Sequence, residues 1–162
     1  MGTGVFGGCK VVEPQVRPPT PRQLEGMDDA DRALLARVLS EPIEYIDHVL
    51  FRQANVEKVL FGEKATLGDG STYFAENREV DPASGYGEGS ALNSAQEILL
   101  FQRFNYARLR IARVLTKYKE KSMPTDVVRD LLAWAHRATI ARGMIVQANV
   151  PLVLAMAKRT RL

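Results

Sequence analysis

The residues that follow Pro124 constrain the fold of this chain more than any other stretch. Apolar side chains recur there in steps of three and four, which is the spacing of one face of an α-helix. They are Val127, Leu131, Trp134, Ala138, Ala141, Ile145, Ala148, Leu152 and Ala155. We therefore expect one long helix that packs antiparallel on the helix before it.

Two residues interrupt this pattern, Gly143 and Pro151. A proline inside a helix removes one amide donor and clashes with the preceding turn, so we expect a kink or a break near Val150-Pro151. Trp134 is the only tryptophan. Because it falls within the apolar seam, we expect it to be a core anchor and not a base-stacking side chain.

The preceding helix is expected from Ser94 to about Tyr118. Ser94 and Glu97 have the spacing of a capping box, in which each side chain satisfies a free amide at the helix start. Its expected buried positions are Leu100, Phe104, Ala107, Ile111, Val114 and Tyr118. Four cations lie along a different face at spacings of seven, three and four, namely Arg103, Arg110, Arg113 and Lys117.

The front of the chain divides into two segments. Residues 1–27 carry early glycines and then Pro14, Pro18, Pro19 and Pro21, a composition that predicts a disordered, extended tail. Residues 28–92 form an acidic segment, in which we expect short helices from Asp28 and over 56–61. The run 43–51 is read as a strand or an extended arm, and 68–71 and 81–89 as a turn and a glycine-rich linker.

Charge separates the two halves of the chain. Residues 1–92 hold 9 Lys and Arg against 15 Asp and Glu, whereas residues 93–162 hold 13 against 4. This asymmetry suggests that the basic half, 93–162, faces a polyanion or an acidic protein surface. An ordinary solvated helix face explains the same charges about equally well.

Several classes of function find no support in the sequence. The start of the chain lacks the basic and apolar regions of a secretory signal, and no apolar run approaches the length of a membrane span. The single Cys9 excludes an internal disulfide, and His48 and His136 have no partners at metal-ligand spacing. We therefore expect a cytoplasmic protein that is not an enzyme, with no cofactor and no metal.

Two groups of residues carry a resemblance to a known family. Ala148-Asn149, Leu152-Val153 and the run 156–159 resemble the opening helix of region 2 in bacterial RNA polymerase sigma factors of the sigma-70 family. The runs 92–97, Leu100-Phe101 with Asn105-Tyr106, and the phrase Glu44-Tyr-Ile are similar to a planctomycete-like subgroup. Pro151 stands where the family pattern has a basic residue.

The resemblance implies an all-α fold, in which an antiparallel helical hairpin leads into the first helix of a sigma region 2 domain. It implies a transcription initiation factor that binds core RNA polymerase and directs promoter DNA recognition, here expected as a truncated form. The polymerase-contact candidates are Asn149, Leu152, Val153, Lys158 and Arg159. The nucleic-acid-contact candidates are Arg103, Arg110, Arg113 and Lys117.

Two other readings of the residues remain open. The chain could be a small helical interaction protein that binds RNA or an acidic protein partner through its basic face. It could also be a plain structural helical hairpin.

Overall fold

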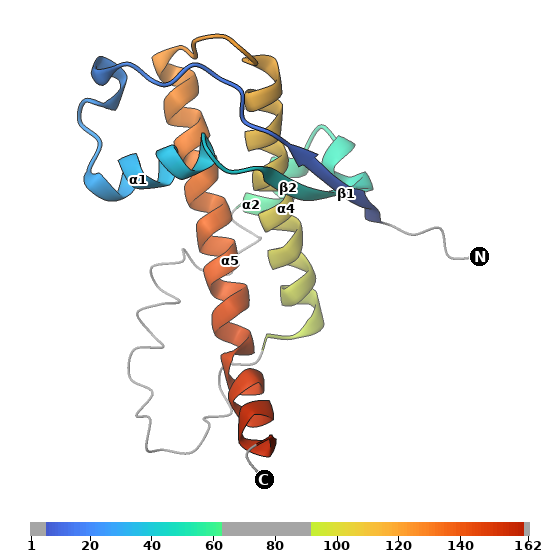
Figure 1. Ribbon diagram of the computed structural model, residues 1–162. Helices are drawn as coiled ribbons and strands as arrows, with labels where there is room; N and C mark the ends of the chain where they lie inside the picture. Colours follow the sequence, from blue (N-terminus) through green and yellow to red (C-terminus); the bar gives the residue numbers. More distant parts are fainter. Residues whose placement is uncertain (1–5, 63–91, 161–162) are drawn as a thin grey trace.

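The computed structural model describes residues 6–62 and 92–160, and its main feature is a helical hairpin (Figure 1). Helix α4 (Ser94–Lys117) and helix α5 (Thr125–Arg159) run antiparallel, side by side, and α5 extends past the start of α4. The molecule is mostly helical, as predicted, although a small sheet accompanies the helices.

The start of α4 differs by one residue from the prediction. Asn93, not Ser94, is the N-cap, and its side chain accepts a hydrogen bond from the amide of Gln96 at 2.9 Å. Gln96 in turn accepts from the amide of Asn93 at 3.0 Å, which completes the reciprocal capping box. The predicted pair of Ser94 and Glu97 is therefore wrong, because Asn93 offers an equally good acceptor one position earlier.

The predicted seam of α5 is buried over its first part. Leu131, Trp134, Ala138 and Ala141 lie in the core against α4, whereas Leu152 and Ala155 are exposed. The prediction for α4 also holds, since Leu100, Ala107 and Ile111 are buried. More of α4 is buried than one stripe, and these further positions are Asn105, Tyr106, Leu109, Ala112 and Leu115.

The additional burial on α4 comes from a two-stranded antiparallel sheet. Strand β1 (Phe6–Val12) pairs with strand β2 (Ile43–His48), with Val12 opposite Ile43 and an irregularity between Phe6 and Cys9. β2 packs against α4 (Figure 1). Of the two readings of the run 43–51, the strand therefore holds for Ile43–His48, and the predicted all-α fold is mostly helical with this small sheet added.

The predicted disordered tail is also wrong from Phe6 onward. After β1 the extended chain passes over the closed end of the hairpin (Figure 1), where the amide of Arg17 donates to the carbonyl of Lys121 at 3.1 Å. The prolines keep this segment extended, as predicted, and the 3₁₀ helix η1 (Pro21–Leu24) follows. Gln23 donates from Nε2 to the carbonyl of Met123 at 2.6 Å, which holds η1 beside the start of α5.

The short helices of the acidic segment form as predicted. Helix α1 (Asp29–Val38) is capped by Asp28, which accepts from the amide of Asp31 at 2.7 Å. The 3₁₀ helix η2 (Val49–Arg52) follows β2, and helix α2 (Val56–Phe61) ends at Gly62. A Cβ at Gly62 would lie 2.2 Å from the carbonyl oxygen of Lys58, so only glycine fits there. The predicted turn at 68–71 and linker at 81–89 lie outside the described residues.

Helix α5 does not break at Pro151. It is continuous from Thr125 to Arg159, with Pro151 inside it. We expected a kink or a break near Val150-Pro151. The continuous helix excludes the break. The proline lies in a part of α5 where every residue from Asn149 to Thr160 is exposed, so no neighbouring element of the described chain constrains it.

Candidate functional site: the free end of α5

The five polymerase-contact candidates all lie on the last part of α5, which we call the free end (Asn149–Thr160). Every residue of the free end is exposed to solvent. The last fully buried residue of α5 is Met144, which packs with Leu100 near the start of α4, and Gln147 and Ala148 after it are half-buried. Since α4 begins at Ser94, α5 continues beyond the start of its partner helix.

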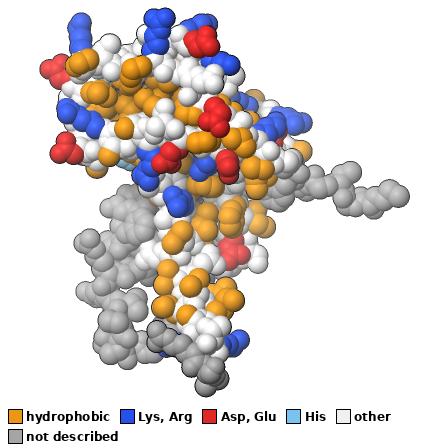
Figure 2. Space-filling view, viewed as in Figure 1, with side chains coloured by type: hydrophobic (Ala, Val, Ile, Leu, Met, Phe, Trp, Pro, Cys, Tyr) orange, Lys and Arg blue, Asp and Glu red, His pale blue; other side chains and the backbone are white. Residues whose placement is uncertain are grey.

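The free end is apolar around its circumference. Leu152, Val153 and Leu154 are consecutive and are 60%, 61% and 48% exposed. With 3.6 residues per turn, three successive side chains point to widely separated directions. Figure 2 shows hydrophobic side chains gathered over the lower part of this helix. A helix that is apolar on all sides normally lies inside a protein core or a bilayer, so the free end requires enclosure by more than one contact.

Polar groups mark the two limits of the free end. Asn149 donates from Nδ2 to the carbonyl of Ile145 at 2.8 Å, which leaves its side-chain oxygen available as an acceptor. Lys158 and Arg159 lie in the last turn, where positive charge complements the negative end of the helix dipole. A partner for this surface therefore needs apolar side chains along the helix and acidic groups at its C-terminal end.

The length and composition of α5 are also those of a helix that could cross a membrane. The helix contains an 18-residue window with a mean hydropathy of 1.5, of which 11% is buried, so it is long and apolar enough to cross a membrane. The sequence-based expectation of no span considered only uninterrupted apolar runs. Core helices of soluble proteins have the same length and composition, so this property alone does not assign the helix to a bilayer.

Two of the four nucleic-acid-contact candidates make their contacts within the fold. Arg103 donates from Nε to the carbonyl of Leu60 at 2.6 Å and lies over the ring of Phe61, and burial lowers the pKa of its guanidinium. Arg110 forms an ion pair with Glu57 and lies 4.8 Å from the ring centroid of Trp134. These two cations cover aromatic rings and bind α2 to α4.

The other two candidates lie on the surface. Arg113 is exposed, and the ammonium of Lys117 lies 5.5 Å from the ring centroid of Tyr118. The structure therefore does not bring all four cations together in one accessible stripe. The reason is that α4 is packed against other elements on more than one side, so cations at spacings of seven, three and four do not share one solvated face.

Asn105 links two of the segments that carry the family resemblance, and sequence reasoning gave it no structural role. This buried side chain accepts from the amide of Ile46 at 2.8 Å and donates to the carbonyl of Phe101 at 2.9 Å. It thereby ties the Glu44-Tyr-Ile phrase of β2 to the Asn105-Tyr106 phrase of α4. A polar residue within an otherwise apolar helix stripe was the only signal in the sequence that pointed to this contact.

Both histidines have structural partners. Nδ1 of buried His48 accepts from the amide of Leu50 at 3.1 Å, as expected for a structural residue, and Nε2 of His136 lies 2.7 Å from Oδ1 of Asp31. Within residues 6–62 and 92–160, no three His, Cys, Asp or Glu side chains are grouped so that they could hold a metal ion.

Comparisons with protein-family models, curated proteins and solved structures find no match for this chain.

Proposed function

We propose that this chain acts in the cytoplasm as a transcription initiation factor of the sigma-70 type, which binds core RNA polymerase through the free end of α5. One observation supports the proposal above all others. The residues that resemble the family run from Ala148 to Arg159, and all of them after Ala148 lie in the stretch of helix that is exposed, apolar around its circumference and basic at its end.

The exposed apolar side chains of the free end would be stabilised by burial against a large protein partner. Leu152, Val153 and Met156 each expose about half or more of their surface, and burying such side chains is worth about 1.5–3 kcal/mol each. Ordering costs offset part of this gain, so a partner must enclose several of them together. Acidic groups of that partner would meet Arg159.

The promoter-directing part of the proposal rests on the family resemblance. Among the described residues, the exposed cations of α4 offer contacts to phosphate, and such contacts position a protein without reading sequence. We therefore expect this chain on its own to bind core polymerase while preferring promoter over scrambled DNA by less than tenfold, which is 1.4 kcal/mol.

The test is a pull-down of core RNA polymerase by the full chain, repeated with Leu152→Asp combined with Val153→Asp. These side chains are exposed, so the double variant should fold normally while losing at least tenfold in polymerase affinity. A matched control is Ile98→Asp combined with Phe101→Asp, which alters exposed apolar residues of α4. Equal loss in both double variants, or no polymerase binding by the unchanged chain, would contradict the proposal.

The competing function is binding of RNA or an acidic protein through the basic face of α4. Arg113 and Lys117 are the candidates that remain accessible for it. Each phosphate contact contributes about 0.7 to the log–log salt slope on a single strand. If this function is correct, Arg113→Ala with Lys117→Ala should flatten the slope by about 1.4, and adding Arg103→Ala and Arg110→Ala should change it little further. Tight RNA binding without polymerase binding would favour this function over the first.

A further inference from the structure

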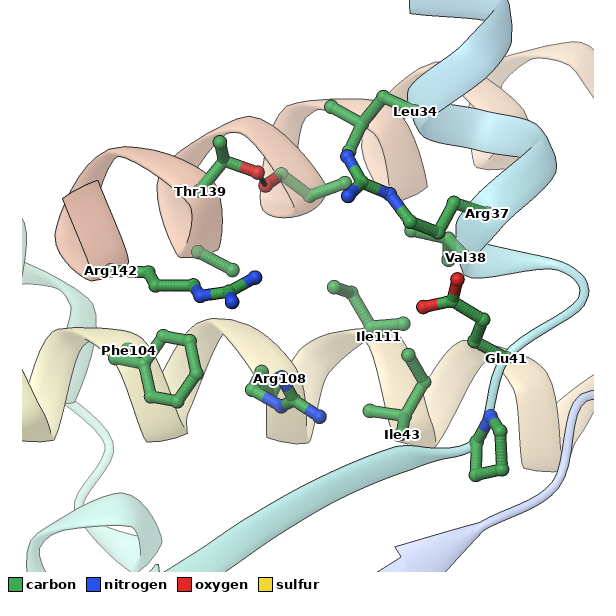
Figure 3. A pocket seen from close by; sticks show the side chains of 13 residues that line it. Leu34, Arg37, Val38, Glu41, Ile43, Phe104, Arg108, Ile111, Thr139 and Arg142 are labelled. Atoms are coloured by element: carbon green, nitrogen blue, oxygen red, sulfur yellow. Dashed lines mark hydrogen bonds between the residues drawn. The ribbon is translucent and has the colours of Figure 1, made fainter. Parts of the chain in front are cut away.

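A hollow lies where α1, the start of β2, α4 and α5 meet (Figure 3). It has a volume of about 170 Å³ and is open to solvent on one side. It is separate from the free end of α5, because its α5 residues are Ala135, Ala138, Thr139 and Arg142. Neither the family resemblance nor the proposed function assigns it a role.

The floor of the hollow is apolar. Val38 of α1, Ile111 of α4 and Ala138 of α5 line it, and all three are buried. α5 presents alanine at both Ala135 and Ala138, and these short side chains leave the space that a larger residue would fill. Thr139, on the wall, is not a free polar group, because its hydroxyl donates to the carbonyl of Ala135 at 2.9 Å.

The rim of the hollow carries three guanidinium groups, those of Arg37, Arg108 and Arg142. Arg108 donates from Nε to the carbonyl of Glu44 and lies 5.1 Å from the ring centroid of Phe104. Its terminal nitrogens have no acceptor among the described residues, and neither has the guanidinium of Arg37 or Arg142. In Figure 3 the side chain of Arg142 reaches toward the centre of the hollow from α5.

One carboxylate, that of Glu41, lies among the lining residues and points toward the hollow (Figure 3). It forms no ion pair with the three arginines within the described chain, so the lining has an excess of two positive charges. Burial lowers the pKa of the Arg108 guanidinium; Glu44 opposes this shift, and the like charge of Arg142 adds to it. A negative charge placed between Arg108 and Arg142 would relieve this repulsion.

We propose that this hollow binds a small organic anion, whose carboxylate or phosphate group lies between Arg108 and Arg142 and whose short apolar body rests on the floor. Guanidinium groups bind both kinds of oxyanion through paired hydrogen bonds. The volume suits a body of about the size of benzene, which occupies a cavity of about 150 Å³ in another protein. Larger ligands would extend through the open side.

The test is a titration of the full chain with benzoate, phenyl phosphate and the neutral benzamide, followed by nuclear magnetic resonance shifts of the amides around Arg142. We expect saturable binding of at least one anion, with benzamide binding at least tenfold more weakly. The anion that binds more tightly identifies the group that the site prefers.

Variants separate this site from general charge attraction. Arg142 is exposed and has no partner in the described chain, so Arg142→Gln should fold normally and weaken anion binding at least tenfold. Arg113→Gln removes the same charge elsewhere on the surface and should leave binding within twofold. Glu41→Gln removes the opposing carboxylate and should tighten binding.

Three results would overturn the proposal: no saturable binding of either anion, equal binding of benzamide, or equal losses in Arg142→Gln and Arg113→Gln. Circular dichroism of each variant establishes that the comparison is made between folded proteins. The outcome is independent of polymerase binding, because none of these substitutions lies on the free end of α5.

Discussion

Trp134 joins three helices of the core, α2, α4 and α5. It is 3% exposed, and its ring makes edge contacts with Phe61 of α2 and Tyr106 of α4. The guanidinium groups of Arg110 and Arg137 lie 4.8 and 4.3 Å from its ring centroid. The core position of Trp134 was predicted from its place in the apolar seam and is confirmed.

We expect Trp134→Ala to lower the free energy of unfolding by about 3–5 kcal/mol, because it leaves a cavity where three helices meet. Trp134→Phe should cost clearly less, because it keeps an aromatic ring and removes an indole N–H that has no acceptor among the described residues. Urea unfolding followed by circular dichroism measures both. A cost below 1 kcal/mol for the alanine variant would contradict the core assignment.

Asn105 gives a second prediction at this scale. Asn105→Ala leaves the Ile46 amide without its partner, so we expect a loss of about 1–3 kcal/mol in the free energy of unfolding. Asn149→Ala is the matched control, since Asn149 is exposed and bonds only within its own helix. It should change the stability by less than about 0.5 kcal/mol. Similar losses in both variants would argue against a special role for Asn105.

The sequence predicted roles for single residues only where periodicity carried the information. Trp134 belonged to a spacing that repeats, so its burial could be predicted. Arg103 and Arg110 were expected to face solvent, but they cover aromatic rings that come from α2 and α5. Arg37, Arg108 and Arg142 were not singled out at all. They meet only in the folded chain, and no spacing along the sequence brings them together.

At the scale of elements, the hairpin was predictable and the sheet was not. Steps of three and four identified α5, and its partner α4 was placed correctly to within one residue at its start. Strand β1 was missed because its early glycines, Gly7 and Gly8, suggested a flexible tail. Its pairing with β2 is a contact between distant parts of the chain, which local composition does not reveal.

The ion pairs of Asp47 in the sheet predict how the stability of the fold depends on pH. Asp47 of β2 lies 3.2 Å from the ammonium of Lys10 on β1 and 3.4 Å from the guanidinium of Arg52. Burial acts to raise the pKa of this carboxyl, but the hydrogen bonds and charges of its partners lower it below its ordinary value. A lowered pKa in the folded state means that Asp47 stabilises the fold above its unfolded pKa of about 3.9. This contribution disappears as the pH falls through the lower folded pKa.

We therefore expect Asp47→Asn to be less stable than the unchanged chain at pH 6, by up to about 1 kcal/mol, because both partners are exposed. The difference should shrink as the pH falls below the unfolded pKa of about 3.9. Urea unfolding at a series of pH values measures it. Glu13→Gln, which changes an exposed carboxyl near the end of β1, should show no such difference at pH 6. A constant difference for Asp47→Asn at every pH would contradict the assignment to ionisation.

At the scale of the whole molecule, the two ends of the hairpin differ. The segment after β1, η1 and α1 lie around the closed end, whereas at the opposite end α5 extends past the start of α4 (Figure 1). Residues distant in the sequence meet at the closed end, as Gln23 and Met123 do. Contacts between distant segments therefore stabilise the closed end, whereas the free end carries a run of exposed apolar side chains, namely Val150, Leu152, Val153, Leu154 and Met156.

Removing residues 150–162 should accordingly change the free energy of unfolding by less than about 0.5 kcal/mol, because the described part of this stretch is exposed throughout. The shortened chain should also self-associate less, because the deletion removes an apolar surface. Thermal unfolding and sedimentation velocity measure the two effects. A fall in Tm of more than about 2–4 °C, which corresponds to about 1 kcal/mol for a chain of this length, would show that these residues contribute to the core.

The buried position of Trp134 also determines what the intrinsic fluorescence of this protein measures. It is the only indole in the chain and lies buried in the middle of the hairpin against Tyr106 of α4, so its fluorescence should be blue-shifted and should follow the integrity of this part of the core. Asn149 is 15 residues further along the same helix, which corresponds to about 22 Å. A partner that encloses the free end would leave this emission largely unchanged. Folding can therefore be read optically while binding is measured separately, without a label attached to either site.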